Sequence, residues 1–437
     1  MEVSVETTQG LERRMTVQVP AERVDNEVEN RLQSMKGRVR MDGFRPGKVP
    51  LKVVRQRYGA QVRQEVLGEV IQATYSEALN EKDLRPAGQP SVEPTQMEPG
   101  QDLEYTATFE VMPEVAVKDL DKVSIKRPDV EVSDDDVEEV LQRLQKQHAE
   151  YKAVKRKARK EDRVTIDFHG QVDGEDFEGN TGEDVPVTLG SGGMPEEFEK
   201  SLEGIKAGEE TTIEYTFPEQ FPDEKIAGKT ASFQVTAKAV EGPDLPELDD
   251  GFAEQLGFKD EGIDGLRQKI RENLERERDQ AVRQNVKQQA MDGLLEHNDV
   301  EIPQSLLDGE IDHLRNQAKE RMRQYGAGDA EPDLPASAFE DEARRRVKLG
   351  LLVNEVIRAN EIQVDEDRLR ETLEGIASGY ERPQEVIQYY TQNRQLMEGL
   401  EISVLEEQVA EHIAQQAKVE DAKMSLDELM KQQQSSQ

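Results

Sequence analysis

The stretch that most constrains this chain is Gly43-Phe44-Arg45-Pro46-Gly47-Lys48-Val49-Pro50, which joins an aromatic residue and two cations to four helix-breaking residues. Glycine permits positive φ, and each proline fixes its own φ and pushes the preceding residue towards extended backbone. Apolar residues recur at helical spacing on both sides of this stretch. They are Val24, Val28, Leu32, Met35 and Val39 before it, and Leu51, Val54 and Tyr58 after it. We therefore expect an exposed loop tip that joins two helices.

The charge around this loop differs from that of the rest of the chain. Residues 31–63 include ten basic residues and one acidic residue, whereas the whole chain carries a formal net charge of −36. A basic island with an aromatic tip favours docking on a polyanion, with a shape-specific contact added. The same composition also fits a solvated helix face whose Phe44 folds back onto its own domain. Composition alone does not separate these two interpretations.

The pattern Gly43-Phe44-Arg45-x-Gly47-x-x-Pro50 resembles the ribosome-docking signature of the bacterial trigger factor family, chaperones that wait at the exit of the peptide tunnel. The resemblance continues through residues 53–59 and 248–253 to the helical end, so it covers almost the whole chain. Some members carry lysine where this chain has Pro46, and the replacement lowers the charge of the loop. The resemblance implies a set of ribosome-binding residues: Gly43, Phe44, Arg45, Pro46, Gly47, Lys48 and Pro50.

Bulk properties exclude several classes of protein. No run approaches the ~20 apolar residues of a membrane span, and residues 1–6 lack the basic and apolar parts of a signal peptide. We therefore expect a cytoplasmic protein.

The absence of cysteine excludes disulfides, a thiolate nucleophile and a thiolate metal site. The five histidines, at 148, 169, 297, 313 and 412, show no metal-ligand spacing, so we expect no metal. The negative charge disfavours DNA as a partner.

The first part of the chain, residues 1–112, has the pattern of an α/β domain. Residues 2–7 and 13–19 have strand composition, and residues 103–111 alternate apolar and polar side chains, as in a strand with one solvated face.

A connector at 113–149 contains an extended part at 117–128. It also contains a helix that begins after Ser133, where aspartates 134 to 136 suit a helix N-terminus. This helix cannot bury its apolar stripe alone, so we expect it to pack on a distant segment.

Residues 150–245 show short strands and glycine-rich turns. Residues 164–168 and 233–239 alternate apolar and polar side chains, and a short helix at 195–202 lies between them. This pattern predicts a small sheet that closes over one helix. The loop Leu189-Gly190-Ser191-Gly192-Gly193 lacks the spacing of a phosphate-binding loop or a serine nucleophile, and we interpret it as a plain turn. The basic run 152–160 is expected to be a solvated linker.

The same segment resembles an FKBP-type peptidyl-prolyl isomerase domain in three ordered motifs: Val164-Thr165-Ile166-Asp167-Phe168-x-Gly170, Asp173-Gly174-x-x-Phe177-Glu178, and Leu202-x-Gly204-Ile205-x-x-Gly208-Glu209. Prolyl isomerisation needs no nucleophile, metal or cofactor, because an apolar pocket that favours the twisted amide suffices. The resemblance implies a pocket made of Phe168, Phe177, Glu178, Val185, Met194, Pro195, Phe198, Phe221 and Phe233. Residues 195–197 and Val185 depart from the family pattern, which predicts weak or altered activity. For any single phenylalanine, ordinary core packing remains the alternative.

From residue 246 onwards the pattern is helical and polar. Residues 266–294 carry about one apolar residue per turn, and breaks fall at 302–303, 325–335 and 379–383. The densest apolar helix is expected between Phe339 and Ile357, as a central support for helical arms. We assign 246–423 to a helical chaperone domain and 424–437 to a disordered tail.

The sequence as a whole predicts a multidomain α+β protein with an N-terminal α/β ribosome-docking domain, an FKBP-like domain of sheet and helix, and an all-helical C-terminal domain with arms. The resemblance implies an ATP-independent chaperone that shields nascent chains and isomerises X-Pro bonds without a cofactor. The implied partners are the large ribosomal subunit, through its protein and RNA, and unfolded polypeptides, with a homodimer left open for the free protein. Two alternatives are a stand-alone prolyl isomerase with helical client-binding appendages, and a purely structural interaction protein.

Overall fold

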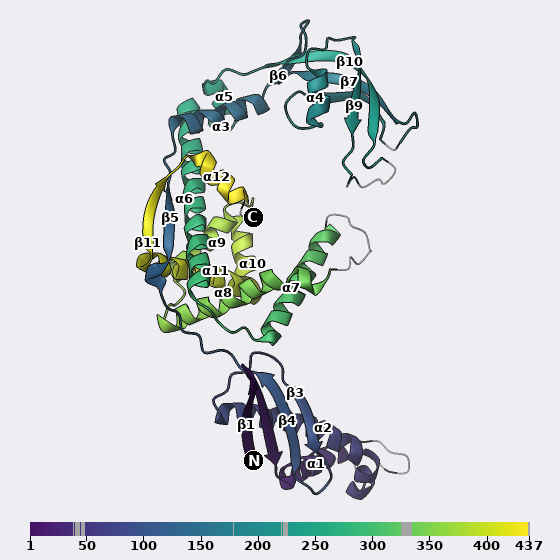
Figure 1. Cartoon of the computed structure of the whole chain (residues 1–437), viewed down its shortest axis with the longest axis vertical. Helices are drawn as coiled ribbons and strands as arrows, with labels where there is room; N and C mark the ends of the chain where they lie inside the picture. Colours follow the sequence, from purple (N-terminus) through teal and green to yellow (C-terminus); the bar gives the residue numbers. More distant parts are fainter. Residues whose placement is uncertain are drawn as a thin grey trace. The chain divides into compact units, whose positions relative to one another are not determined.

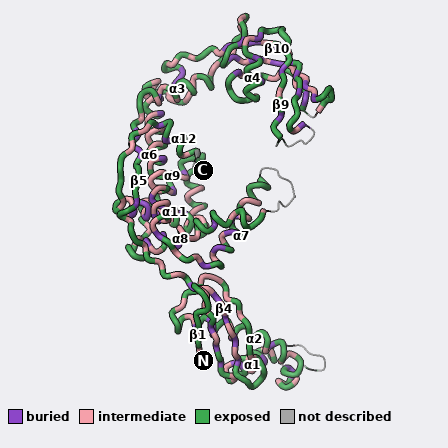
Figure 2. The backbone as a smooth tube through the Cα atoms, in the orientation of Figure 1, coloured by how far each residue is buried: buried purple, intermediate pink, exposed green. Residues whose placement is uncertain are grey.

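The computed structural model describes residues 1–37, 39, 44, 49–177, 179–219, 221, 226–324 and 334–435. The chain divides into a first unit, residues 1–127 with 284–422, and a second unit, residues 128–283 with 423–437. Figure 1 shows the elements along the chain, and Figure 2 shows how buried and exposed residues are distributed along the strands and helices. Within the described ranges, no helix combines the length and the apolar character that crossing a bilayer requires.

The first unit begins with an antiparallel sheet in the order β1-β2-β4-β3. Its strands are β1 Glu2–Gln9, β2 Glu12–Val19, β3 Ser91–Gln96 and β4 Leu103–Glu110. Side chains of β4 alternate between buried and half-buried, as the sequence predicts for a strand with one solvated face. Helices α1 Ala21–Lys36 and α2 Leu51–Glu81 share one core with the inward side chains of β2 and β4.

Helices α1 and α2 flank the basic loop, which confirms the expected helix pair. The first helix ends at Lys36, one turn earlier than the apolar spacing to Val39 predicts. Ion pairs join the two helices: Arg23–Glu77, Arg31–Glu69, Arg55–Glu29 and Arg63–Asp25. Arg31, Arg55 and Arg63 belong to the basic island, so acids from outside the island offset part of its charge.

The helical part of the first unit is built around a second core. It combines Val123 and Ile125, from the connector, with buried residues of three helices. These are the C-terminal part of α6 Gly262–His297, α8 Glu340–Ala359 and α11 Arg394–Gln416. The predicted dense helix is α8, with Leu352 and Val356 buried in this core. The connector forms a short 3₁₀ turn, Leu120–Lys122, and strand β5 Ser124–Asp129, which pairs with β11 Lys418–Lys423.

Three further helices complete this region. Helix α7 Gln304–Gln324 packs on α8 through Leu307, Ile311 and Leu314, next to the 3₁₀ turn Ala336–Ala338. Helices α9 Glu366–Ala377 and α10 Pro383–Gln392 precede α11. The sequence breaks at 302–303 and 379–383 fall between helices, as predicted. The chain also breaks at Asn360 and at Asn393, where Asn393 caps α11, and the apolar pattern did not indicate either break.

Glu110 joins the end of β4 to the start of α7. Its carboxylate accepts hydrogen bonds from the backbone N–H groups of Gln304 and Ser305, at 2.9 and 2.8 Å. These N–H groups lie in the first turn of α7, where no carbonyl of the helix can accept from them. Burial alone would raise the pKa of Glu110, but the two N–H donors outweigh it and hold the pKa below its ordinary value.

The second unit contains helix α3 Asp134–Gln147, which begins after Ser133 as the sequence predicts. A capping box joins Ser133 and Asp136 at its start. Val137 and Leu141 of α3 are buried against Phe252, from α5 Asp250–Gln255, and against Leu266 and Ile270 of α6. The predicted packing on a distant segment is therefore confirmed, because these partners lie more than 100 residues away along the chain.

The tail expected to be disordered instead contains helix α12 Leu426–Ser435. Leu426 and Leu429 are buried together with Val130 and Ala281. Ser425 and Glu428 form a reciprocal cap, in which each accepts a hydrogen bond from the other's backbone N–H. The expectation of disorder is wrong over residues 426–435, because apolar burial and this cap stabilise a helix in spite of the glutamine-rich composition.

Residues 150–244 form the expected small sheet over one helix. The strands are β6 Glu150–Ala153, β7 Arg163–Val172, β8 Thr181–Thr188, β9 Glu210–Thr216 and β10 Thr230–Asp244. The antiparallel order is β6-β10-β7-β8, and β9 also pairs with β10. The helix is α4 Glu196–Leu202, which begins after Pro195.

The basic run 152–160 is not the solvated linker that its composition predicts. Lys152 lies in β6, which pairs with β10, and Ala158 is buried in the core. The Arg156 guanidinium forms an ion pair with Asp162, whose side chain is only 1% exposed. Asp162 also accepts from the N–H of Arg159 at 2.8 Å, so one buried carboxylate folds the run back onto the sheet.

Candidate functional site

A chain of aromatic rings occupies one side of the five-stranded sheet. Phe233 of β10 meets Phe168, Phe177 and Phe198, with ring centroids 6.0, 6.1 and 5.6 Å apart and steeply inclined planes. Phe177 in turn meets Phe217 at 5.8 Å, and Phe217 meets Tyr215 and Phe221 at 5.1 and 4.9 Å. We call this set the aromatic cluster: Phe168, Phe177, Phe198, Tyr215, Phe217, Phe221 and Phe233.

Two glycines let the rings lie close to the backbone of the sheet. A Cβ atom on Gly170 would lie 2.4 Å from Phe233, and one on Gly182 would lie 2.5 Å from Phe168. Both distances are below any real van der Waals contact, so any side chain there would displace a ring. Gly170 pairs with Phe233 across the β7–β10 ladder, which brings this ring over the glycine.

The other residues that the isomerase resemblance implies are spread around this cluster. Val185 and Met194 are half-buried and pack against the same core. Pro195 is exposed at the N-terminus of α4, and Phe198 is buried one turn further on. Phe221 is 37% exposed and reaches the cluster through Phe217. Glu178 lies outside the described residues.

Sequence reasoning missed Tyr215, Phe217 and Asn180. The first two belong to β9 and the residue after it, and they reach the cluster because β9 pairs with β10. Asn180 is buried, and its amide donates to the Gly170 carbonyl at 2.8 Å, while Gly170 N–H donates to the Asn180 carbonyl at 2.6 Å. The asparagine therefore fixes the glycine beneath Phe233. Asn180 lies two residues beyond the end of the second isomerase-like motif, so none of the three motifs pointed to it.

The cluster itself offers apolar ring surface, and the one charged side chain next to it that is buried, among the described residues, is Glu199. Lys238, at the register shift of β10, contacts the carboxylates of Asp167 and Asp184, both at 2.8 Å. These hydrogen bonds raise the pKa of the lysine and lower that of Asp167. Within the described ranges, no group of three acidic or histidine side chains could hold a metal. The arrangement suits binding of an apolar segment and stabilisation of a less polar state.

The predicted docking loop is only partly covered by the structure. Phe44 is 41% exposed in a bend, and Pro50 is exposed at the N-terminus of α2. Val49 is fully buried, so the chain re-enters the core two residues before α2 begins at Leu51. Gly43, Arg45, Pro46, Gly47 and Lys48 lie outside the described residues. At 41% exposure, the Phe44 ring is not buried against its domain, which argues against the alternative in which it folds back.

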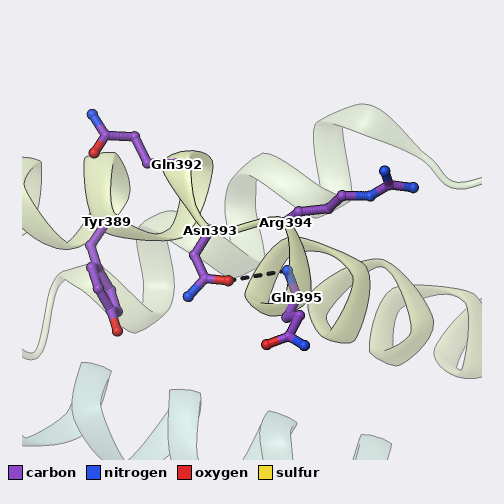
Figure 3. A pocket seen from close by; sticks show the side chains of 5 residues that line it. All are labelled: Tyr389, Gln392, Asn393, Arg394 and Gln395. Carbon is purple, nitrogen blue, oxygen red and sulfur yellow. Dashed lines mark hydrogen bonds between the residues drawn. The ribbon is translucent and has the colours of Figure 1, made fainter. Parts of the chain in front are cut away.

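A hollow of about 410 Å³ lies where α10 meets α11. It is lined by Tyr389, Gln392, Asn393, Arg394 and Gln395. Figure 3 shows the Tyr389 ring and the Gln395 side chain on the same side of the junction, while Asn393 accepts a hydrogen bond from the Gln395 N–H at 3.1 Å. Tyr389 is 63% exposed, so this hollow presents an aromatic ring beside amides.

Comparison with known proteins agrees with this anatomy. Residues 1–144 match a family model described as bacterial trigger factor protein, and residues 262–415 match the model of its C-terminus. Residues 154–238 match the FKBP-type peptidyl-prolyl cis-trans isomerase model. The chain is therefore built from both parts of the trigger factor family, with an isomerase domain between them.

Relatives match over nearly the full length. The chain is 61% identical to the trigger factor of Alkalilimnicola ehrlichii, over 99% of this chain and 96% of that protein. It is 56% identical to that of Halorhodospira halophila, over 98% of each. A solved structure concerned with promiscuous substrate recognition by the trigger factor chaperone shares the fold, with a TM-score of 0.50 at 19% identity, covering 95% of this chain and 99% of that one. The chain belongs to the bacterial trigger factor family.

Proposed function

We propose that this chain is an ATP-independent, ribosome-associated chaperone that works in the cytoplasm, shields nascent chains at the tunnel exit and isomerises X-Pro bonds. Family membership at 61% identity is the observation that carries this proposal. The isomerase match at residues 154–238 and the aromatic cluster support its catalytic part. The alternative, a stand-alone isomerase with helical client-binding appendages, leaves the exposed Phe44 and the basic loop without a role.

The aromatic cluster is the proposed prolyl site. An X-Pro bond rotates through a twisted state in which the amide loses resonance and becomes less polar. Apolar walls without strong donors favour that state over the planar amide, which water solvates better. We assign the walls to Phe168, Phe177, Val185, Met194, Pro195, Phe198, Phe221 and Phe233, and we add Phe217 because it bridges Phe177 and Phe221. Glu178, which lies outside the described residues, is kept in the proposed site because the isomerase resemblance implies it.

The loop between α1 and α2 is the proposed ribosome anchor. A single exposed apolar side chain is ordinary on a protein surface, so the support comes from the combination of an exposed Phe44 with the cations of the basic island. We propose that Phe44 enters an apolar niche of a ribosomal protein of the large subunit, while Arg45 and Lys48 meet acidic side chains or RNA phosphate. Gly43, Pro46, Gly47 and Pro50 shape the loop.

Co-sedimentation with large ribosomal subunits tests the anchor. The triple variant Phe44→Ala, Arg45→Ala, Lys48→Ala should lose binding with an unchanged melting curve, since Phe44 contributes little to the core. A matched control is Met97→Ala with Met112→Ala, which removes exposed apolar residues elsewhere in the same region. Binding of the wild-type protein should also weaken modestly as salt rises. A stable triple variant that sediments like the wild type contradicts the assignment.

The helical region offers the proposed surface for unfolded clients. Tyr380, Tyr389 and Ile402 are 60%, 63% and 58% exposed, and they lie between the end of α9 and the middle of α11. Exposed apolar side chains among charged ones give weak contacts to many sequences while the empty chaperone stays soluble. The hollow beside Tyr389 adds amides that suit the backbone of an extended client.

Suppression of aggregation of a chemically unfolded client tests this surface. The variant Tyr380→Gln, Tyr389→Gln, Ile402→Gln should suppress aggregation less than the wild type at equal stability. The Met97→Gln, Met112→Gln variant should behave as the wild type. A variant lacking residues 150–245 should still suppress aggregation, because the helical surface supplies the contacts. Complete loss of suppression in that deletion variant would instead favour the stand-alone isomerase.

Each segment along the chain has one proposed role. Residues 1–112 dock on the ribosome, 113–149 connect, 150–245 isomerise, and 246–423 hold clients. The core shared by Val123 and Ile125 with α6, α8 and α11 supports a connector that belongs with the helical region.

We further propose that the free protein forms a homodimer, which sedimentation equilibrium tests directly.

A further inference from the structure

Glu199 is a nearly buried carboxylate next to the proposed prolyl site. It is 6% exposed and directly follows Phe198 in α4. Its two oxygens accept from two backbone N–H groups: Oε2 from Gly190 at 2.7 Å and Oε1 from Met194 at 3.2 Å. A buried carboxylate is costly to desolvate, so its two hydrogen bonds must offset that cost for the helix to keep it there.

The two N–H groups stand at the two ends of one loop, residues 190–194. Gly190 and Gly192 have φ of +83° and +74°, so the loop adopts turns that other residues disfavour. Leu189, just before the loop, is held by backbone hydrogen bonds with Glu161 and Asp162, at 2.8 and 2.9 Å. The loop beyond Leu189 has no strand pairing, and Glu199 joins its start to its end.

The loop carries Met194, which packs against the same core as the aromatic cluster. Inside the loop, Ser191 Oγ donates to the Thr188 carbonyl at 2.8 Å and accepts from Gly193 N–H at 3.3 Å. These bonds set the turn, and the chain runs from Met194 through Pro195 into α4. Glu199 adds a side-chain tie from α4 back to both ends of the loop, at Gly190 and Met194.

We propose that Glu199 is a positioning residue of the isomerase: it clamps the glycine-rich loop so that Met194 forms a fixed wall beside Phe198. This inference rests on the proposed prolyl site. It gives the Leu189-Gly190-Ser191-Gly192-Gly193 stretch a role beyond a plain turn. The glycines allow the tight path, and the carboxylate holds the path in one conformation.

Isomerase kinetics of the full-length chain on a proline-containing peptide test the clamp. Glu199→Ala should lower kcat/KM roughly tenfold, because a wall misplaced by about an ångström loses much of its effect on the transition state. Glu199→Gln keeps one acceptor oxygen and should lose less. In both variants the amide protons of Gly190 and Met194 should exchange faster with solvent, a readout at the two donors themselves.

Two further variants separate positioning from general stability. If Glu199 acts through Met194, the double variant Glu199→Ala, Met194→Ala should be no less active than Met194→Ala alone. Val240→Ala removes a buried side chain seven residues along β10 from Phe233, so it should destabilise the domain without changing kcat/KM of the folded protein.

Each outcome decides between the alternatives. Unchanged activity of folded Glu199→Gln and Glu199→Ala, or losses that add to that of Met194→Ala, overturns the positioning role. An equal loss in Val240→Ala also overturns it, because the effect would then follow stability. If Phe198→Ala and Phe233→Ala are fully active, the prolyl site itself is wrong, which is a separate failure from that of the clamp.

Discussion

The rings of Phe198 and Phe233 meet edge to face, with centroids 5.6 Å apart and planes inclined at 79°. One ring comes from α4, the helix over this sheet, and the other from β10, the longest of its described strands. Edge-to-face packing favours a fixed arrangement of two rings over free rotation. The contact therefore joins α4 to β10 and sets the shape of the surface between them.

Removing either ring should lower isomerase activity. Phe198→Ala and Phe233→Ala each delete apolar wall, and each should also cost about 3–5 kcal/mol of stability because both side chains are buried. Activity per folded molecule is the relevant quantity, measured by exchange of a proline peptide with folding checked by circular dichroism. Phe252→Ala is the matched control, since this equally buried phenylalanine lies in the core of α3, α5 and α6. A folded Phe198→Ala protein with full activity would remove the ring from the site.

Gly170→Ala should disturb the aromatic cluster although it replaces none of the aromatic residues. The new methyl group would lie 2.4 Å from Phe233, so the ring must shift or tilt. We expect lower kcat/KM and a loss of about 1–3 kcal/mol from overpacking. Gly68→Ala, in the interior of α2 with open space around it, should instead stabilise the chain by about 0.5–1 kcal/mol and leave the activity unchanged. Full activity of Gly170→Ala would show that the Phe233 ring position does not matter.

Asp162 should make the isomerase segment sensitive to acid. Burial tends to raise the pKa of this carboxyl, but hydrogen bonds from Arg156 and the Arg159 N–H outweigh burial and lower the pKa below its ordinary value near 3.8. A lowered folded-state pKa means that the stabilisation is complete above pH 3.8 or so and is lost as pH falls through the folded-state pKa.

The variant Asp162→Asn should therefore lose about 1–3 kcal/mol near neutral pH, where the wild type gains most from the charge. The difference between the two proteins should shrink below about pH 3.8. Thermal unfolding between pH 2 and pH 7 measures it. Asp176→Asn, which removes a solvated carboxylate beside His169, is the control and should change stability little. A pH-independent difference for Asp162→Asn would contradict the charge-based explanation.

Glu110→Ala should remove the hydrogen-bond acceptor that caps the N-terminus of α7. The N–H groups of Gln304 and Ser305 would lose their acceptor, at a cost of about 0.5–2 kcal/mol, similar to the loss of a helix cap. Hydrogen exchange at these two amides should accelerate, whereas Glu104→Ala in the same strand should leave them protected. If exchange at both amides is the same in Glu110→Ala as in the wild type, Glu110 does not cap the helix.

Local patterns in the sequence predicted most of the elements that position the site. Alternation placed β4 and parts of β7 and β10, Ser133 followed by three aspartates placed the start of α3, and the isomerase resemblance gave Phe168, Phe198 and Phe233. The sequence could not indicate Phe217, because its ring reaches Phe177 only through the β9–β10 pairing. Nor could it indicate the contact of Glu110 with residues 194 positions away. The glutamine-rich composition predicted disorder over helix α12, although Ser425 and Glu428 have the spacing of a capping box.

The strands that enter and leave the isomerase domain pair with each other: Glu150 stands opposite Asp244, and Ala153 opposite Glu241. Partners in such an antiparallel pair have Cα atoms only about 5 Å apart. A short turn could therefore replace everything between them without moving the flanking chain. The domain is in this sense a cassette, which recombination could remove, duplicate or exchange for another binding module while the remaining polypeptide keeps its path.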